Sequence, residues 1–251
     1  MDVQTVIYGE VLGAGLLADI ARPTQEGPVP ALIGVHGGRW HYSNRSQLGA
    51  AIDVQQWAGL GFFAMSIEYR LVTCTPAPAC YQDTLCAIRW LHAHADEYGI
   101  DRERIYLTGM SAGGHLVALA ATLGDGPFMK TGGWEDWPTD FRAAISVSGA
   151  YDLLKLDWAC GWITPGWPWD EARRLGSPLE HVAAATRPML LFHSDDDGSI
   201  PVDQARRMDS ALTASGVDHR YLHYSDRGHI PLTRDFVVEE SLRFIGEIEV
   251  E

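Results

Sequence analysis

The stretch LTGMSAGGHLVAL, residues 107–119, constrains the fold more than any other part of this 251-residue chain. Branched and aromatic side chains typical of a β-strand precede it, and Ala and Leu at helical spacing follow it. A strand that passes into a helix without a loop holds the residue at the apex in a strained backbone conformation and requires small neighbours. Gly109 and Gly113 supply those neighbours, so Ser111 is predicted to project from a sharp turn.

Short apolar runs alternate with helical patterns along the chain. This alternation predicts a single α/β domain, residues 1–251, with a mostly parallel twisted sheet of about eight strands and helices on both faces. The sheet is expected to begin with an antiparallel hairpin turned by Gly13-Ala14-Gly15. The expected strands lie near 3–8, 16–22, 31–36, 62–68, 104–109, 143–148, 188–193 and 219–224, and the expected helices near 46–58, 82–97, 112–123, 203–215 and 234–247.

The segment from Gly126 to His181 breaks this alternation, because a single strand is evident in it and it carries six tryptophans with several Pro and Gly. A long irregular stretch of this kind is usually functional or disordered, and this one is too aromatic for disorder. We interpret residues 151–181 as a short Trp-rich cap insertion over the carboxyl ends of the strands, where reactive groups of such a sheet belong.

Net charge, the N-terminal sequence and the cysteines determine which partners, location and disulfides we expect for the chain. Nineteen Lys and Arg against 33 Asp and Glu give a formal charge of -14, which argues against nucleic acid and anionic membrane surfaces as partners. The N-terminus has no signal-peptide pattern and no stretch has the length of a membrane span, so a cytoplasmic protein is expected from the chain as given, and removal of a leader peptide is left open. The cysteines lack zinc-site spacing, and free thiols are the default, with a Cys74–Cys80 disulfide left open.

The turn at Ser111 fits the pattern G-x-S-x-G in its strand-turn-helix context. A serine hydroxyl is a weak nucleophile at neutral pH, so it needs an imidazole within hydrogen-bond reach and an acid that fixes the imidazole tautomer. A strand ends in the carboxylate run 195–197, and the last strand leads to His229, which gives the chain order Ser, Asp, His expected of a triad on this architecture. The glycine turn at 36–40 can direct backbone N–H groups at an oxyanion.

On these motifs the chain resembles the α/β-hydrolase esterases of the BD-FAE (feruloyl-esterase-like) and hormone-sensitive-lipase-like group, to which kynurenine formamidase is related. The resemblance implies Ser111 as nucleophile, Asp197 as the acid among the three aspartates and His229 as base, without a metal or cofactor. It also implies an oxyanion hole made by the N–H groups of Gly38, Arg39 and Ala112. The matching pieces are His36-Gly37-Gly38-Arg39-Trp40, Glu68-Tyr69-Arg70-Leu71, Asp83 with Ala87-Ile88-Arg89-Trp90-Leu91, Gly109–His115, Asp197 with Ile200-Pro201, and Gly228-His229.

Two departures from the family pattern concern the site. Arg39 stands where many of these enzymes have a third glycine, which keeps the backbone donor but adds a cationic side chain that can bias the choice of acyl or leaving group. Ser194 replaces the glycine of the usual His-Gly before the acid loop. The aromatic side chains expected to line the substrate pocket are Trp40, Trp158, Trp162 and Trp167.

The resulting prediction is a serine carboxylic ester hydrolase that acts through an acyl-enzyme on a small ester with a short-chain or aromatic acyl group. An arylformamidase and a polysaccharide deacetylase or feruloyl esterase are the alternatives, since the same triad serves all of them. A non-catalytic ligand receptor on the same fold is a remote alternative, because such receptors are expected to lack a triad member. A homodimer is left open.

Overall fold

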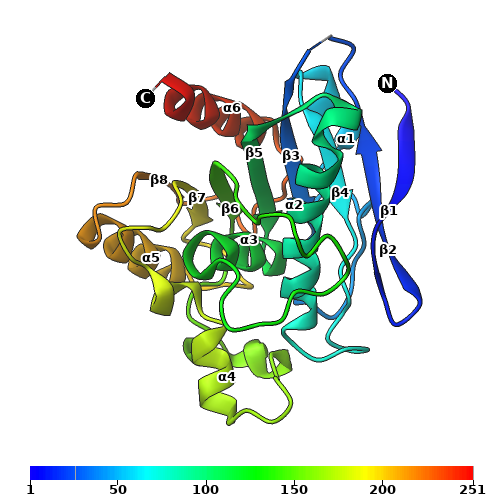
Figure 1. Cartoon of the computed structure of the whole chain (residues 1–251). Coiled ribbons are helices and arrows are strands. Elements are labelled where there is room, and N and C mark those ends of the chain that lie inside the picture. Colours follow the sequence, from blue (N-terminus) through cyan, green and yellow to red (C-terminus); the bar gives the residue numbers. More distant parts are fainter. Residues whose placement is uncertain (26, 251) are drawn as a thin grey trace.

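In the computed structural model, which describes residues 1–25 and 27–250, eight strands form a sheet in the order β1-β2-β4-β3-β5-β6-β7-β8 (Figure 1). β1 and β2 pair antiparallel, as do β2 and β4, and every other neighbouring pair is parallel. This arrangement confirms the predicted α/β-hydrolase fold class. The strands are β1 (Val3–Val11), β2 (Ala14–Ala21), β3 (Val29–Val35), β4 (Phe63–Ile67), β5 (Ile100–Met110), β6 (Ala143–Val147), β7 (Met189–Ser194) and β8 (His219–Tyr224).

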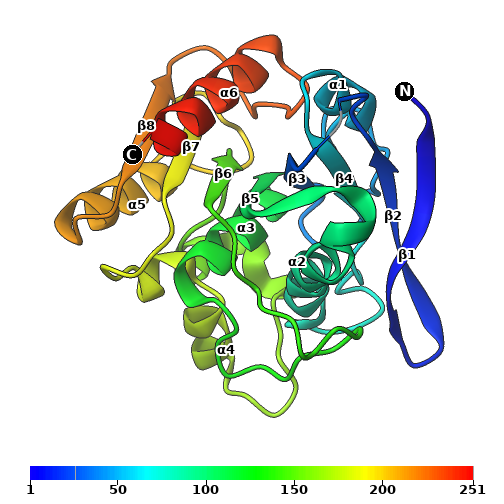
Figure 2. The ribbon, with the colours of Figure 1, turned by 45° about the horizontal axis from the view of Figure 1, so that its top comes forward.

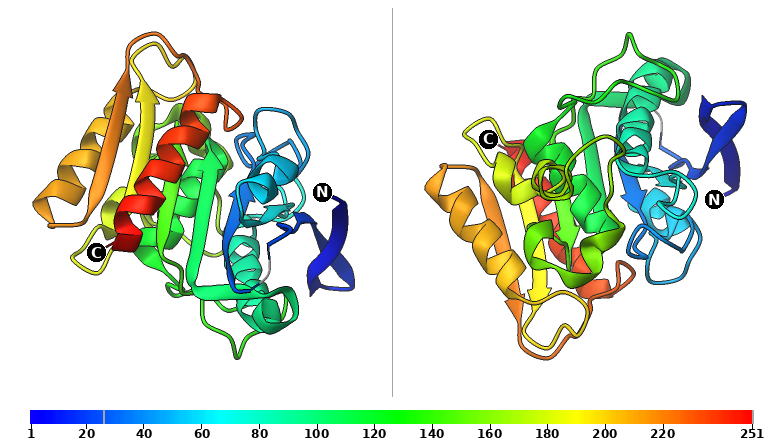
Figure 3. Two further views of the ribbon diagram at one scale, coloured as in Figure 1. Left: turned by 90° about the horizontal axis from the view of Figure 1, so that it is seen from above. Right: turned by 90° about the horizontal axis from the view of Figure 1, so that it is seen from below.

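Helices cover both faces of the sheet, and each face has its own apolar core. α1 and α6 pack on one face, whereas α2, α3 and α5 pack on the other (Figure 3). Alternate strand residues serve the two cores, as in β5, where Ile105 and Leu107 face α2 and α3 while Tyr106 faces the opposite side. The helices are α1 (Val54–Gly59), α2 (Ala79–Tyr98), α3 (Ala112–Leu123), α4 (Trp169–Leu175), α5 (Asp203–Ala214) and α6 (Asp235–Val250).

The N-terminal hairpin turns one residue earlier than expected. Leu12 and Gly13 form a two-residue turn with φ of 51° and 80°, and Ala14 already pairs with Val11. Two successive positive φ angles match the twist of the flanking strands. The predicted antiparallel hairpin with Gly13 in its turn is confirmed, and the prediction that Ala14 and Gly15 belong to the turn was wrong.

The expected helix over 46–58 exists only as α1. The Asp53 side chain accepts hydrogen bonds from the backbone N–H groups of Gln55 and Gln56, which caps the helix and sets its start at Val54. Gly49, with φ of 83°, lies in the irregular chain before it. Residues 46–53 therefore lie outside the helix, in turns and irregular chain along the carboxyl edge of the sheet.

Residues 151–181 form the 3-10 helices η1 (Leu153–Lys155), η2 (Asp157–Gly161) and η3 (Pro178–His181) and the short helix α4, which the sequence did not predict. The segment lies beyond α3 at the bottom of Figures 1 and 2. The Gln204 side chain on α5 holds its start by accepting from the N–H groups of Tyr151 and Asp152, at 2.8 and 2.7 Å.

Two further findings concern the described part of the chain. No helix there is both long and apolar enough to cross a bilayer. Cys74 is exposed and Cys80 is buried in the first turn of α2, and both are free thiols, so the disulfide left open by the sequence is not formed.

Candidate active site

Ser111 lies at the turn between β5 and α3, with φ of 55° and ψ of -116°. This conformation is rare for a residue with a side chain and is held by its surroundings, including a 2.8 Å hydrogen bond from its N–H to the Val147 carbonyl. A Cβ added to Gly109 would lie 2.4 Å from the Gly113 carbonyl carbon, and one added to Gly113 would lie 2.0 Å from the Val35 oxygen. Both positions therefore require glycine, as the sequence predicted.

Asp197 and His229 follow the carboxyl ends of β7 and β8 and meet at the same edge of the sheet. The Nδ1 atom of His229 lies 2.8 Å from Oδ2 of Asp197 and 3.0 Å from Oδ1, so the ring donates from Nδ1 and leaves Nε2 as an acceptor. Asp197 Oδ1 also accepts from the N–H groups of Ser199 and Ile200, at 2.8 and 2.9 Å. Burial raises the pKa of this carboxyl, but the hydrogen bonds from His229 and the two N–H groups outweigh burial, and the pKa lies below its ordinary value.

The other two aspartates of the run have partners of their own. Asp195 lies 2.8 Å from Nε2 of His223 and 2.7 Å from the Arg206 guanidinium, on the surface. Asp196 accepts a hydrogen bond from the N–H of Gly228 at 2.8 Å. Within the described residues, Asp197 alone contacts His229 among the three.

Ser194, the second departure from the family pattern, links the loops that carry the acid and the imidazole. Its hydroxyl donates to Asp196 Oδ1 at 2.6 Å and accepts from the N–H of Arg227 at 2.9 Å. Asp196 in turn holds the N–H of Gly228, the residue before His229. A glycine at position 194 would remove the hydroxyl at the centre of this network.

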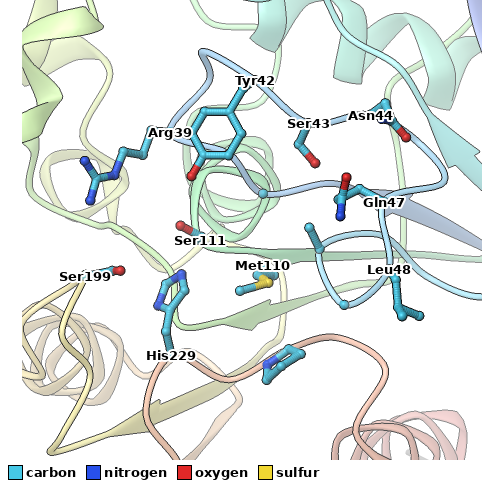
Figure 4. A pocket seen from close by; sticks show the side chains of 15 residues that line it. Arg39, Tyr42, Ser43, Asn44, Gln47, Leu48, Met110, Ser111, Ser199 and His229 are labelled. Carbon is cyan, nitrogen blue, oxygen red and sulfur yellow. The ribbon is translucent and has the colours of Figure 1, made fainter.

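Ser111 and His229 line the same cavity, whose volume is about 540 Å³. Figure 4 shows the imidazole pointing toward the serine side chain. Since Nδ1 is occupied by Asp197, the ring faces the serine with the nitrogen that can accept a proton.

The glycine turn after β3 lies on the cavity wall beside Ser111. Gly38 has φ of 120°, and a Cβ there would lie 2.1 Å from the Tyr42 carbonyl oxygen, so glycine is required. The N–H of Gly37 donates to the Ala50 carbonyl, whereas no acceptor for the N–H groups of Gly38, Arg39 or Ala112 is found in residues 1–25 and 27–250. Those three are the donors that the family resemblance implies for an oxyanion hole.

Two buried histidines support this turn. His36 stacks on Tyr69 with ring centroids 4.1 Å apart and donates from Nδ1 to the Gly37 carbonyl. His115, on α3, accepts from the Trp40 indole at 3.2 Å and donates to the Gly176 carbonyl at 2.6 Å. Burial lowers the pKa of each imidazole to about 4 despite these backbone hydrogen bonds, so both rings are neutral and have a structural role.

The tryptophans expected in the pocket are not on its walls. Trp40 and Trp162 are 0% and 1% exposed and pack edge to face 5.3 Å apart beneath the turn, because the hydrogen bond to His115 draws Trp40 inward. Trp167 is 43% exposed and is not among the residues that line the cavity. Trp158 is half-buried, and its indole donates to the carbonyl of Ser199, a pocket residue, at 3.0 Å. The structure thus corrects the prediction for these four side chains.

The pocket wall is instead a polar loop that the sequence analysis missed. Arg45 anchors this loop through ion pairs with Asp19 and Glu68, both at 2.8 Å. The helical pattern over 46–58 conceals this loop in the sequence, although Ser43-Asn44 and Gly49 are residues typical of turns. Its side chains in the pocket are Tyr42, Ser43, Asn44, Gln47 and Leu48.

The residues of this site offer no arrangement suited to a metal ion. Among the described residues, no group of three or more His, Cys, Asp or Glu side chains has the geometry of a metal site. The groups that the cavity presents are the Ser111 hydroxyl and the His229 imidazole, which is backed by the Asp197 carboxylate.

Comparison with known proteins finds esterases. The BD-FAE family model matches residues 18–212. Esterase LipC of Mycobacterium tuberculosis (strain ATCC 25618 / H37Rv) is 31% identical over 250 residues, covering 89% of this chain and 58% of LipC. Probable carboxylic ester hydrolase LipM of the same strain is 31% identical over 214 residues, covering 80% of this chain and 49% of LipM. The chain spans about half the length of these curated relatives.

Solved structures show the same fold. A truncated form of a carbohydrate esterase from gut microbiota superposes with a TM-score of 0.88 at 23% identity, covering 100% of this chain and 97% of the other. Butyrate-bound esterase Est2 of Thermogutta terrifontis superposes with a TM-score of 0.82 at 23% identity, covering 99% and 93%.

Proposed function

The chain belongs to the BD-FAE family, and on that premise we propose that it is a serine carboxylic ester hydrolase with the triad Ser111, His229 and Asp197. The observation that carries the proposal is the cavity in which the strained serine and the Asp197-bound imidazole face each other. An ester carbonyl placed there would meet a nucleophile, a base and free backbone donors together.

The reaction follows from these positions. Ser111 Oγ attacks the ester carbonyl carbon while His229 Nε2 accepts the hydroxyl proton, and Asp197 stabilises the imidazolium through Nδ1. The N–H groups of Gly38, Arg39 and Ala112 stabilise the tetrahedral oxyanion, each contributing roughly 3–4 kcal/mol.

Collapse of that intermediate breaks the ester C–O bond, and His229 returns the proton to the leaving alcohol. Water then attacks the acyl-enzyme with the imidazole as base. The acid is released and the Ser111 hydroxyl is restored.

The size of the cavity favours small acyl groups. Its volume of about 540 Å³ must hold the acyl and alcohol parts together, and a loop with several polar side chains forms one side of it. A long alkyl chain would leave part of its apolar surface unburied beside those polar groups. Each Å² of apolar surface that stays in water forgoes about 25 cal/mol of binding free energy. We therefore propose short-chain or small aromatic acyl esters as substrates.

A second candidate is the removal of acyl groups from carbohydrates. The observation that favours it is the same polar loop, whose hydroxyl and amide groups suit a polyhydroxylated alcohol. One structural relative of high TM-score is named a carbohydrate esterase. This candidate shares the mechanism and differs in the alcohol that leaves.

Initial rates on p-nitrophenyl acetate, butyrate and octanoate, with Ser111→Ala as control, test the proposal. We expect serine-dependent release of p-nitrophenolate that falls steeply from acetate to octanoate. Acetylated xylo-oligosaccharides assayed beside them distinguish the second candidate. The absence of turnover on every one of these esters would overturn the proposed function.

A further inference from the structure

We propose that Arg39 recognises a carboxylate on the substrate, so that the preferred esters carry a negative charge close to the ester bond. The inference rests on the proposed function, because it concerns the same cavity. It starts from the charges in the pocket: apart from His229, Arg39 is the ionisable cation there, and no Asp or Glu side chain is among the lining residues. Although the chain has a net charge of -14, the charged side chain that Arg39 brings to the wall of this cavity is thus a cation.

The Arg39 guanidinium is free for a ligand. Within residues 1–25 and 27–250 it has neither a carboxylate within 4.0 Å nor a hydrogen-bond acceptor. Arg45, six residues further along the same loop, holds two carboxylates at 2.8 Å and is a structural residue. The two arginines therefore differ in role: one anchors the loop, and the other has its hydrogen-bond donors unused.

The position of Arg39 is defined by an aromatic platform. Its guanidinium carbon lies 5.5 Å from the centre of the Trp158 ring. Trp158 is itself held by its hydrogen bond to the Ser199 carbonyl and by contact with Trp40, 5.1 Å away. A guanidinium stacked on an indole keeps its edge available for a second partner. Figure 4 shows Arg39 and Ser199 on one side of Ser111, opposite Asn44 and Gln47.

The backbone adds a second argument. Arg39 has φ of 53°, a region that glycine occupies freely and that costs a residue with a side chain of order 1 kcal/mol. The oxyanion turn needs only the N–H at this position. An arginine at this position is thus strained where a glycine would not be. What the arginine adds in return for that strain is a charged group at the pocket.

A carboxylate fits this site better than a phosphate ester does. A planar guanidinium binds the two oxygens of a carboxylate in a bidentate geometry. A phosphate dianion favours a second cation, and the pocket offers no other Lys or Arg among its lining residues. The carboxylate can belong to the acyl part or to the alcohol part of the ester, and paired substrates distinguish these sources.

The test uses a charged ester and a neutral partner of similar size in each arm. For the alcohol part the pair is 4-acetoxybenzoate and 4-acetoxybenzamide, and for the acyl part it is monomethyl glutarate and methyl pentanoate. The quantity measured is the ratio of kcat/KM for the charged ester to kcat/KM for its neutral partner. This ratio cancels any effect of a substitution on the oxyanion turn itself.

In at least one arm we expect Arg39→Gln to lower this ratio about tenfold, the size expected for a charge-assisted hydrogen bond. Arg39→Lys, which keeps the charge without the planar fork, should give an intermediate value. Arg243→Gln, which removes one charge from an exposed position on α6, should leave the ratio within twofold of the wild type.

Ratios for Arg39→Gln and Arg39→Lys within twofold of the wild type in both arms would overturn the inference while leaving the proposed function intact. Wild-type turnover of the neutral esters without turnover of either charged ester would also overturn it. A wild-type protein that hydrolyses none of the four esters, nor p-nitrophenyl acetate, would instead overturn the proposed function and the inference with it.

Discussion

Replacing Asp197 with Asn should lower kcat about 10⁴-fold, the loss expected when a triad histidine is held in the wrong tautomer. The structure explains why the tautomer must change. Oδ1 of Asp197 accepts two backbone N–H groups, from Ser199 and Ile200, so the oxygen of an asparagine must stay there. Its NH₂ group then faces His229 Nδ1, and two donors cannot share that contact. His229 would have to carry its proton on Nε2, where it cannot accept one from Ser111.

This loss corresponds to about 5.4 kcal/mol of activation free energy, at 1.36 kcal/mol for each factor of ten. Asp195→Asn is the matched control, because it makes the same chemical change two residues away. The Asp195 side chain is 39% exposed and its ion pairs lie at the surface, so kcat should fall less than about threefold.

The assay is steady-state hydrolysis of p-nitrophenyl acetate by both variants, with thermal unfolding to verify that each is folded. The ¹⁵N chemical shifts of the His229 ring report the tautomer directly. Activity of Asp197→Asn above about a tenth of the wild type, or equal losses in the two variants, would refute the assignment of Asp197 as the acid.

Four other predictions concern stability and loop geometry. Burial lowers the pKa of His36 and His115 to about 4 from 6.5, so the unfolded chain binds protons that the folded chain does not. The free energy of unfolding should therefore keep this contribution above pH 6.5 and fall as the pH drops toward 4, by roughly 1.4 kcal/mol per pH unit for each histidine. In urea titrations at several pH values, His115→Asn should make the free energy of unfolding depend less steeply on pH. Gly113→Ala should destabilise by more than about 2 kcal/mol, because its Cβ would lie 2.0 Å from a strand carbonyl oxygen. Gly246→Ala, with open space around a helical position, should stabilise by about 0.5–1 kcal/mol in the same denaturant assay. Ser194→Gly should lower kcat roughly threefold, the effect of about one hydrogen bond, because the loop carrying the imidazole loses the hydrogen bond from the Arg227 N–H to the acid loop and keeps the one from the Gly228 N–H to Asp196; unchanged kcat would show that the hydrogen bond to Ser194 is dispensable.

The sequence predicted the sheet and the positions around Ser111 well, because both depend on local chemistry. Short apolar runs with branched side chains fit the buried strands of a parallel sheet, and the close approaches at Gly109 and Gly113 tolerate no other residue. The order of serine, acid and histidine follows from where strands end. The choice of Asp197 from its run depended on the family resemblance, since local composition does not distinguish three adjacent carboxylates.

The pocket walls were not predictable from the same signals. Whether an indole lines a cavity or fills a core depends on the direction that the backbone gives it, and Trp40, with φ of 62°, is turned inward toward His115. The polar loop was hidden for a related reason. Ala50 to Ile52 have helix-like apolarity, but Ile52 packs under Gly34, whose added Cβ would lie 2.5 Å from the Ile52 side chain. Such long-range packing leaves no periodic trace in the sequence.

Covalent labelling by an organophosphate is the most direct test of the central claim that Ser111 is the nucleophile of an ester hydrolase. The purified protein is treated with paraoxon, the released p-nitrophenolate is counted, and the modified peptide is identified by mass spectrometry. We expect one diethylphosphoryl group per chain, on Ser111, with loss of esterase activity in proportion, and no label on Ser111→Ala. Label on a different residue, or ester turnover by Ser111→Ala at the wild-type rate, would contradict the account.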